Sequence, residues 1–141
     1  MRPSWDEWFL RGAEWASERG ACSRRQVGAL IIDPVSHDII EPGYNGPPSG
    51  HPDCLQGACP RATSGVEPGS SYDTGPGRCI AIHAELNAII RAGRRARGAH
   101  MYLTHEPCDG CMKAIMGSGI VRVAWRHDNQ KGYAEWTAPS S

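Results

Sequence analysis

Two short segments contain the residue types that most often do chemistry: residues 83–85 (His-Ala-Glu) and 107–111 (Pro-Cys-Asp-Gly-Cys). Histidine nitrogen and cysteine sulfur are ligands that Zn²⁺ prefers, and a catalytic zinc keeps one of its four positions for water. His83, Cys108 and Cys111 would supply the other three. The spacing therefore predicts an open zinc site built from two separate segments.

Glu85 adds a carboxylate that a purely structural metal site does not need. Because it lies two residues after His83, its side chain should point away from the imidazole and toward the open position of the metal. A carboxylate there can take a proton from water and return it to a substrate. A structural zinc is closed by four ligands, so Glu85 argues against a non-catalytic zinc-binding module, which stays an alternative.

Both segments are predicted to lie at the starts of helices. Residues 81–92 place apolar side chains at helical spacing and end at Gly93, and Pro107 is expected as the first residue of a helix that runs to about residue 116. Two cysteines three residues apart on a first helical turn lie on the same side. The partial positive charge of a helix N-terminus also favours the thiolate that binds metal.

The remaining elements must position these helices. Ser4 and Glu7 form a capping-box pattern for a first helix that should end near Gly20, with an apolar face expected to include Trp8, Phe9, Ala13 and Ala16. Apolar runs predict strands at residues 27–32, 39–40, 100–104 and 120–125. The segment after Trp125 gives no clear fifth strand. The order of elements predicts an α/β layered domain, a mixed sheet covered by helices.

Length and spacing predict one domain over residues 1–141, with a long loop at about residues 43–79 that contains most of the prolines. Loops of that length in a compact domain are usually functional or tied down.

Composition excludes several other classes. Fifteen basic residues balance fifteen acidic ones, so no overall positive field favours long nucleic acids as partners. We find no signal peptide and no apolar run near the roughly 20 residues that span a bilayer. A cytoplasmic protein with no membrane partner is expected.

Four segments together resemble the deoxycytidylate (dCMP) deaminase family. They are residues 22–29 (CSRRQVGA), 43–50 (GYNGPPSG), 83–88 (HAELNA) and 104–111 (THEPCDGC). His-x-Glu with Pro-Cys-x-x-Cys is the signature of zinc nucleobase deaminases in general, and Gly-Tyr-Asn-Gly-Pro-Pro points to the dCMP branch. The similarity covers roughly residues 22–123.

The resemblance implies a three-layer α/β/α cytidine-deaminase-like fold, with a central mixed sheet of about five strands and both zinc-bearing helices on one face. It implies hydrolytic deamination of dCMP to dUMP with zinc-activated water. A deaminase of another small nucleoside, nucleotide or base is the alternative. It further implies a homo-oligomer, often a hexamer, with dCTP and dTTP as effectors.

The resemblance also implies substrate contacts. Asn45 matches a position that contacts the sugar in relatives, although Asn-Gly is equally typical of a tight turn. Ala84 should place its backbone N–H near the pyrimidine carbonyl. Arg24, Arg25 and His51 are candidates for the 5′-phosphate, with solvated surface charge as the alternative for each.

Four cysteines remain outside the catalytic set: Cys22, Cys54, Cys59 and Cys79. A second, structural zinc on these thiolates would tie the long loop to the rest of the domain. The resemblance makes His51 an alternative ligand there. Four reduced thiols are the other interpretation, and a disulfide is disfavoured in a reducing cytosol.

Overall fold

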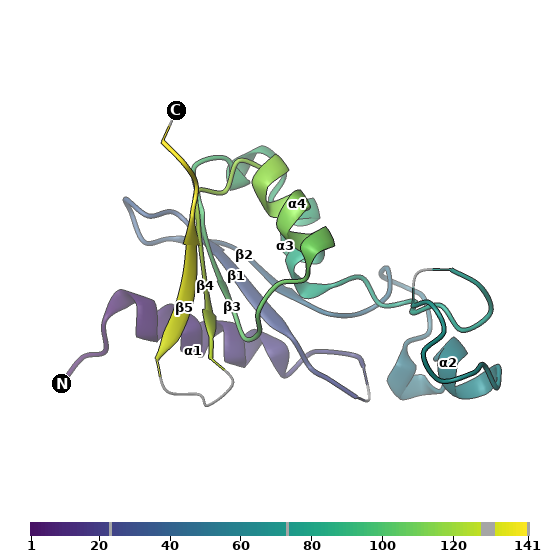
Figure 1. Ribbon diagram of the computed structural model, residues 1–141. Helices are drawn as coiled ribbons and strands as arrows, with labels where there is room; N and C mark the ends of the chain where they lie inside the picture. The colour runs from purple at the N-terminus through teal and green to yellow at the C-terminus, as the bar shows by residue number, and fades with distance from the viewer. Residues whose placement is uncertain (23, 73, 128–131, 141) are drawn as a thin grey trace.

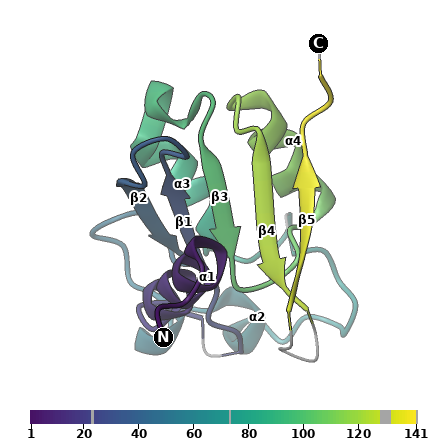
Figure 2. The same ribbon diagram turned by 90° about the vertical axis from the view of Figure 1, so that its left-hand side faces the viewer.

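A computed structural model describes residues 1–22, 24–72, 74–127 and 132–140. Its centre is a five-stranded sheet in the order β2-β1-β3-β4-β5 (Figure 2). The only parallel pair of this sheet is β3 with β4, so the sheet is mixed, as predicted. The strands are β1 (Gly28–Ile32), β2 (Ile39–Tyr44), β3 (His100–Leu103), β4 (Arg122–Arg126) and β5 (Tyr133–Thr137).

Helices cover both faces of the sheet. Helix α1 (Trp5–Ser17) lies on one face, and α3 (Ala84–Ala92) and α4 (Asp109–Gly117) lie on the other (Figure 1). Three short helical segments complete the described elements: η1 (Cys54–Gln56), α2 (Pro60–Thr63) and η2 (Gly93–Ala96). This is the predicted three-layer α/β/α architecture. No helix in the described part of the chain is long and apolar enough to cross a membrane.

Strand alternation produces the two apolar layers. Every residue of β1 is buried, and successive side chains point to opposite faces of a strand. Ala29 and Ile31 therefore join the core under α3 and α4, while Leu30 and Ile32 join the core under α1.

Helix α1 shows the expected Ser4 cap but a different apolar face. The Ser4 hydroxyl accepts a hydrogen bond from the Glu7 amide at 3.1 Å. Trp8, which the sequence placed on the apolar face, is 50% exposed and lies outside the buried face of α1. Leu10, two residues further along, is buried, because an offset of two positions on a helix rotates a side chain by about 200°. The buried face consists of Phe9, Leu10, Ala13 and Ala16.

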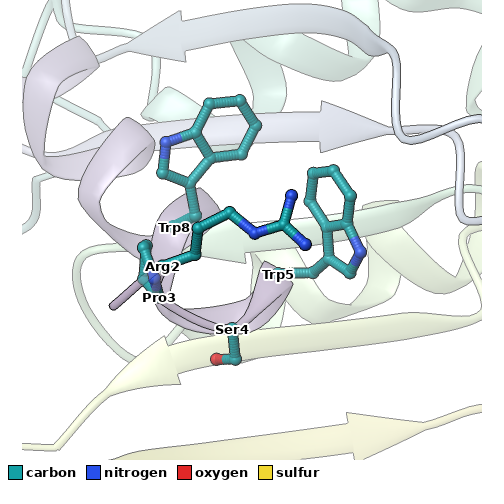
Figure 3. A pocket seen from close by; sticks show the side chains of 5 residues that line it. All are labelled: Arg2, Pro3, Ser4, Trp5 and Trp8. Carbon is teal, nitrogen blue, oxygen red and sulfur yellow. The ribbon is translucent and has the colours of Figure 1, made fainter.

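A shallow hollow of about 430 Å³ lies at the N-terminal end of α1 (Figure 3). Its wall contains the indoles of Trp5 and Trp8 and the guanidinium of Arg2. His37 stacks on Trp5 with ring centroids 3.9 Å apart. The exposed tryptophans thus form an aromatic surface of their own, outside the core.

Strand β5 corrects the sequence-based expectation, which found no clear strand after Trp125. Along β5 only Ala134 and Trp136 are half-buried, and their neighbours face solvent. Trp136 packs against the core under α3 and α4. An edge strand that buries two side chains gives a weak apolar pattern, although the alternation itself was present in the sequence.

The boundaries of two predicted elements move. β2 extends to Tyr44, so residues 43 and 44 leave the predicted loop, and its Pro42 is tolerated because β2 is an edge strand. Helix α3 begins at Ala84 and not at residue 81, because Ile82 forms an isolated antiparallel bridge with Gly46.

A network of ion pairs and hydrogen bonds connects α1 to strands β4 and β5. Asp6 accepts hydrogen bonds from both terminal nitrogens of Arg122, at 2.8 and 3.1 Å, and from the Tyr133 hydroxyl at 2.7 Å. Arg126 donates to Glu7 at 2.7 and 2.9 Å. These contacts join α1 to β4 and β5.

Asp6 should make the stability of the fold depend on acid pH. Burial alone would raise the pKa of Asp6, but hydrogen bonds from Arg122 and two tyrosines lower it from 3.8 to about 2. A depressed carboxyl pKa stabilises the fold above the unfolded value, and this contribution is lost as pH falls from about 4 toward 2. Discounted for partial exposure, we expect about 1–2 kcal/mol.

Urea unfolding of the wild type and of Asp6→Asn between pH 2 and pH 7 tests this expectation. The variant should be less stable at pH 7 and nearly equal to the wild type at pH 2. Asp38→Asn, on an exposed turn, serves as the matched control. A constant difference across the whole pH range would contradict the assignment.

Candidate active site

The three predicted zinc ligands lie close together at the N-terminal ends of α3 and α4. His83 is the N-cap of α3, Cys108 is the N-cap of α4, and Cys111 is the third residue of α4. Their ligand atoms all lie within 4.8 Å of one another. Within the described ranges, no other set of three or more His, Cys, Asp or Glu side chains meets that distance.

The sequence predicted Pro107 as the first residue of the second metal-binding helix, and this prediction was wrong. Helix α4 begins at Asp109, and Pro107 precedes the N-cap. The reason is that Cys108 itself caps the helix. Its backbone is extended, and its sulfur accepts from the Cys111 amide at 3.5 Å, where a capping oxygen would normally stand.

The ligand atoms suit zinc. His83 Nδ1 lies 3.2 Å from the Cys111 sulfur and 3.8 Å from the Cys108 sulfur, so this ring nitrogen faces both thiols. Burial raises the pKa of the Cys111 thiol, and the nearby Glu85 carboxylate raises it further. A cation is therefore needed to hold this sulfur as a thiolate, and one nitrogen with two sulfurs is a zinc donor set.

Glu85 is the second residue of α3 and is only 5% exposed. Its carboxyl lies within hydrogen-bond reach of Cys111. Ala84, the first residue of the same helix, is fully buried, and its N–H lies where the helix offers no acceptor. A buried acid and a helix-end donor thus adjoin the metal ligands.

A pocket of about 360 Å³ opens beside these groups. Val27 and Ala81 add apolar surface, and Arg24, Arg25 and Glu106 add charge. The other lining residues are Cys22, Asn45, Tyr72, Cys79, His83, Ala84, Glu85, His105 and Cys108. His51, the third phosphate candidate, is exposed and does not line this pocket.

Asn45 is 8% exposed, and its side chain is committed to the backbone. Its Oδ1 accepts from the Val27 amide at 2.9 Å, and its Nδ2 donates to the Arg25 carbonyl at 2.8 Å. Asn45 therefore holds the segment that presents Arg24 and Arg25 to the pocket.

Two residues of the quoted motifs have positioning roles that the sequence analysis did not assign. Asn87 donates to the carbonyls of Tyr44 and Ile82, at 2.8 and 3.3 Å, and so ties β2 to the start of α3. At Gly43 an added Cβ would lie 2.4 Å from the Ala84 carbonyl oxygen. Only glycine allows α3 to approach β2 so closely, which explains the first residue of Gly-Tyr-Asn-Gly-Pro-Pro.

Of the other four cysteines, Cys54 and Cys59 interact most strongly with each other, and Cys22 and Cys79 interact more weakly with Cys54. Burial first, and then the neighbouring thiols with Cys59 the foremost, together raise the pKa of Cys54 to about 11. Cys54 and Cys59 are close enough to shift each other's pKa, and Cys22 and Cys79 contribute more weakly to the pKa of Cys54. All six cysteines lie in the described residues and are free thiols.

A buried carboxylate beside three N and S ligands, lining a pocket in an α/β/α domain, defines a zinc-dependent hydrolase. The family model described as "Cytidine and deoxycytidylate deaminase zinc-binding region" matches residues 3–126. The chain belongs to this cytidine and deoxycytidylate deaminase family. His83, Cys108 and Cys111 are the ligands of its catalytic zinc.

Individual relatives agree with the family. A deoxycytidylate deaminase of Mycobacterium phage D29 is 44% identical over 126 residues, covering 88% of this chain and 95% of the phage protein. A deoxycytidylate deaminase of Schizosaccharomyces pombe is 38% identical over 89% of this chain, which spans 38% of the yeast protein's length. The crystal structure of dCMP deaminase from the cyanophage S-TIM5 with dCMP and dUMP superposes with a TM-score of 0.64 at 27% identity, covering 89% of this chain and 83% of that one.

Proposed function

We propose that this chain hydrolyses dCMP to dUMP and ammonia. The observation that carries the proposal is the buried Glu85 carboxylate beside a metal site with three protein ligands. A closed structural site would have a fourth ligand and no use for a buried acid. Similarity to proteins named deoxycytidylate deaminase supports dCMP as the substrate.

His83, Cys108 and Cys111 would hold the zinc, which would lower the pKa of a water molecule so that a nucleophile could form near neutral pH. Glu85 takes a proton from that water and delivers it to N3 of the cytosine ring. As the water oxygen bonds to C4, Glu85 passes the second water proton to the amino group. The C4–N bond then breaks and ammonia leaves, which balances the reaction with one water consumed.

The pocket groups support binding of a pyrimidine nucleotide. The Ala84 N–H can donate to the ring carbonyl, since the helix leaves it without an acceptor. Val27 and Ala81 offer apolar surface to the ring, and Asn45, which lines the same pocket, is proposed to lie near the sugar. Arg24 and Arg25 can bind the 5′-phosphate, because guanidinium groups match phosphate oxygens in pairs.

The substrate assay tests this function directly. Zinc-replete protein is incubated with dCMP, deoxycytidine, CMP, cytosine, guanine and adenosine, and ammonia release is measured. We expect dCMP to have the highest kcat/KM of the set. A higher value for a purine or a free base would keep the zinc chemistry and overturn the substrate. No release from any of the compounds by zinc-loaded protein would favour a non-catalytic zinc module.

We also propose a second, structural zinc near Cys54 and Cys59. The proximity of these two thiols, with Cys22 and Cys79 near enough to influence the pKa of Cys54, supports such a site. A metal there would stabilise a loop whose composition offers few apolar anchors. The alternative of four reduced thiols is distinguished by the metal counts given in the Discussion.

A homo-oligomer remains part of the proposal. Trp5, Trp8 and Trp15 of α1 are each at least half exposed. Large exposed apolar side chains that lie together often mark contact surfaces between proteins. Small nucleotides are the expected partners at the active site.

A further inference from the structure

We propose that Tyr72 determines specificity for the 5′-phosphate, by holding Arg24 at the mouth of the pocket and donating its own hydroxyl to the phosphate. This inference rests on the proposed function, because it concerns the same pocket and the same substrate. It gives the long loop a direct part in substrate recognition.

Tyr72 reaches the active site from a distant part of the sequence. It lies in the loop between β2 and α3, and it lines the same pocket as Glu85 and Asn45. The Arg24 Nη1 atom donates to the Tyr72 hydroxyl at 3.5 Å, across 48 positions of sequence. The loop therefore contributes one polar group to the site.

Arg61 fixes the position of the tyrosine ring. Its guanidinium lies over the Tyr72 ring, 3.9 Å from the centroid. The same guanidinium donates to the carbonyls of Ser70 and Gly77 at 3.0 and 3.2 Å. At the backbone, the Tyr72 carbonyl accepts from the Cys79 amide at 2.6 Å. A half-exposed tyrosine is thus held from its ring and from its main chain.

The chemistry of the pair fits a phosphate monoester. Arg24 offers several N–H donors, and one of them is used on Tyr72. Tyr72 accepts that bond through a lone pair, so its own proton is available for a phosphate oxygen. Hydrogen bonds to a charged acceptor are about twice as strong as neutral ones. A nucleoside without phosphate would gain nothing from either group, so the pair discriminates dCMP from deoxycytidine.

Tyr72→Phe tests the role, because it removes only the hydroxyl and keeps the ring under Arg61. We expect the KM for dCMP to rise about tenfold, with kcat within about twofold of the wild type. The kcat/KM for deoxycytidine should not change, and the Ki for dUMP should rise about as much as the KM. In Arg24→Gln, adding Tyr72→Phe should cost less than about twofold more, because the two residues act together.

Further variants test whether Arg61 acts by positioning the ring of Tyr72 or whether any substitution of this kind weakens the protein in general. Arg61→Gln, which frees the ring of Tyr72, should raise the KM for dCMP and leave kcat unchanged, and Arg61→Lys should restore part of the loss. Tyr44→Phe is the matched control, since Tyr44 also lies against an arginine, Arg91, but does not line the pocket. It should behave as the wild type.

The outcomes distinguish this inference from the proposed function. If the wild type deaminates dCMP, and Tyr72→Phe leaves both the KM and the Ki for dUMP unchanged, the role of Tyr72 is overturned while the function stands. Equal losses with dCMP and deoxycytidine would overturn it in the same way. If the wild type deaminates no cytosine nucleotide, both the function and the role of Tyr72 fall.

Discussion

Replacing Glu85 with glutamine is expected to lower kcat for dCMP by about 10²–10⁴-fold, the range typical of a general acid–base group. Glutamine has nearly the same shape and stays hydrogen-bonded, but it cannot take a proton from water or return one to the substrate. Because Glu85 is buried beside the ligands and is not one of them, zinc content should stay at the wild-type level. KM should change little.

The measurement is steady-state kinetics with dCMP, together with zinc determination and the unfolding midpoint of the same preparations. Glu67→Gln, a change of the same type on the exposed part of the long loop, is the control and should behave as the wild type. Loss of zinc from Glu85→Gln would mean that Glu85 acts as a ligand. Residual activity above about a tenth of the wild-type kcat would show that another group moves the protons.

Replacing Cys108 with serine is expected to abolish the activity through loss of the metal. Cys108 is exposed and caps α4, and serine is a preferred N-cap, so the helix should keep its stability within about 1 kcal/mol. Serine is a poor zinc ligand in comparison with a thiolate. Losing a residue that only hydrogen-bonds to a metal ligand costs up to about 100-fold in activity or metal affinity, so losing a ligand itself should cost more.

Metal counts test the catalytic and the second zinc together. We expect about two zinc ions per wild-type chain and about one in Cys108→Ser, which is inactive. Cys59→Ser, a matched cysteine substitution outside the pocket, should also retain about one zinc ion but remain active. One zinc in the wild type and in Cys59→Ser would remove the second site from the proposal. Activity in Cys108→Ser would overturn its role as a ligand.

Local patterns predicted much of the fold. The Ser4 cap, the buried run of β1, and the helix that follows His83 each depend on residues close together in sequence, and each was confirmed. The errors came where neighbours in space decide. Trp8 continues an apolar pattern but lies 50% exposed, and β5 buries too little surface to give a clear signal.

The candidate site also has a part that local sequence predicts and a part that depends on tertiary packing. Metal-ligand spacing is a local property, because cysteines at an N-cap and three residues later must lie near each other. His83, Cys108 and Cys111 were therefore predicted from the sequence, together with the acid two residues after the histidine. Their placement relative to one another depends on α3 and α4 packing on the same face of the sheet, and Gly43 permits that approach on the β2 side of α3.

The sequence by itself thus determined which residues bind zinc and the family to which the chain belongs, and it predicts Glu85 as the residue that carries a proton. Only the tertiary structure decided what surrounds them. It directs the amide of Asn45 onto the backbone of residues 25 and 27, and it brings Tyr72 to Arg24. Such contacts join residues far apart in the chain, and they form only when the packed sheet and the loop hold both partners in place, so no local spacing encodes them.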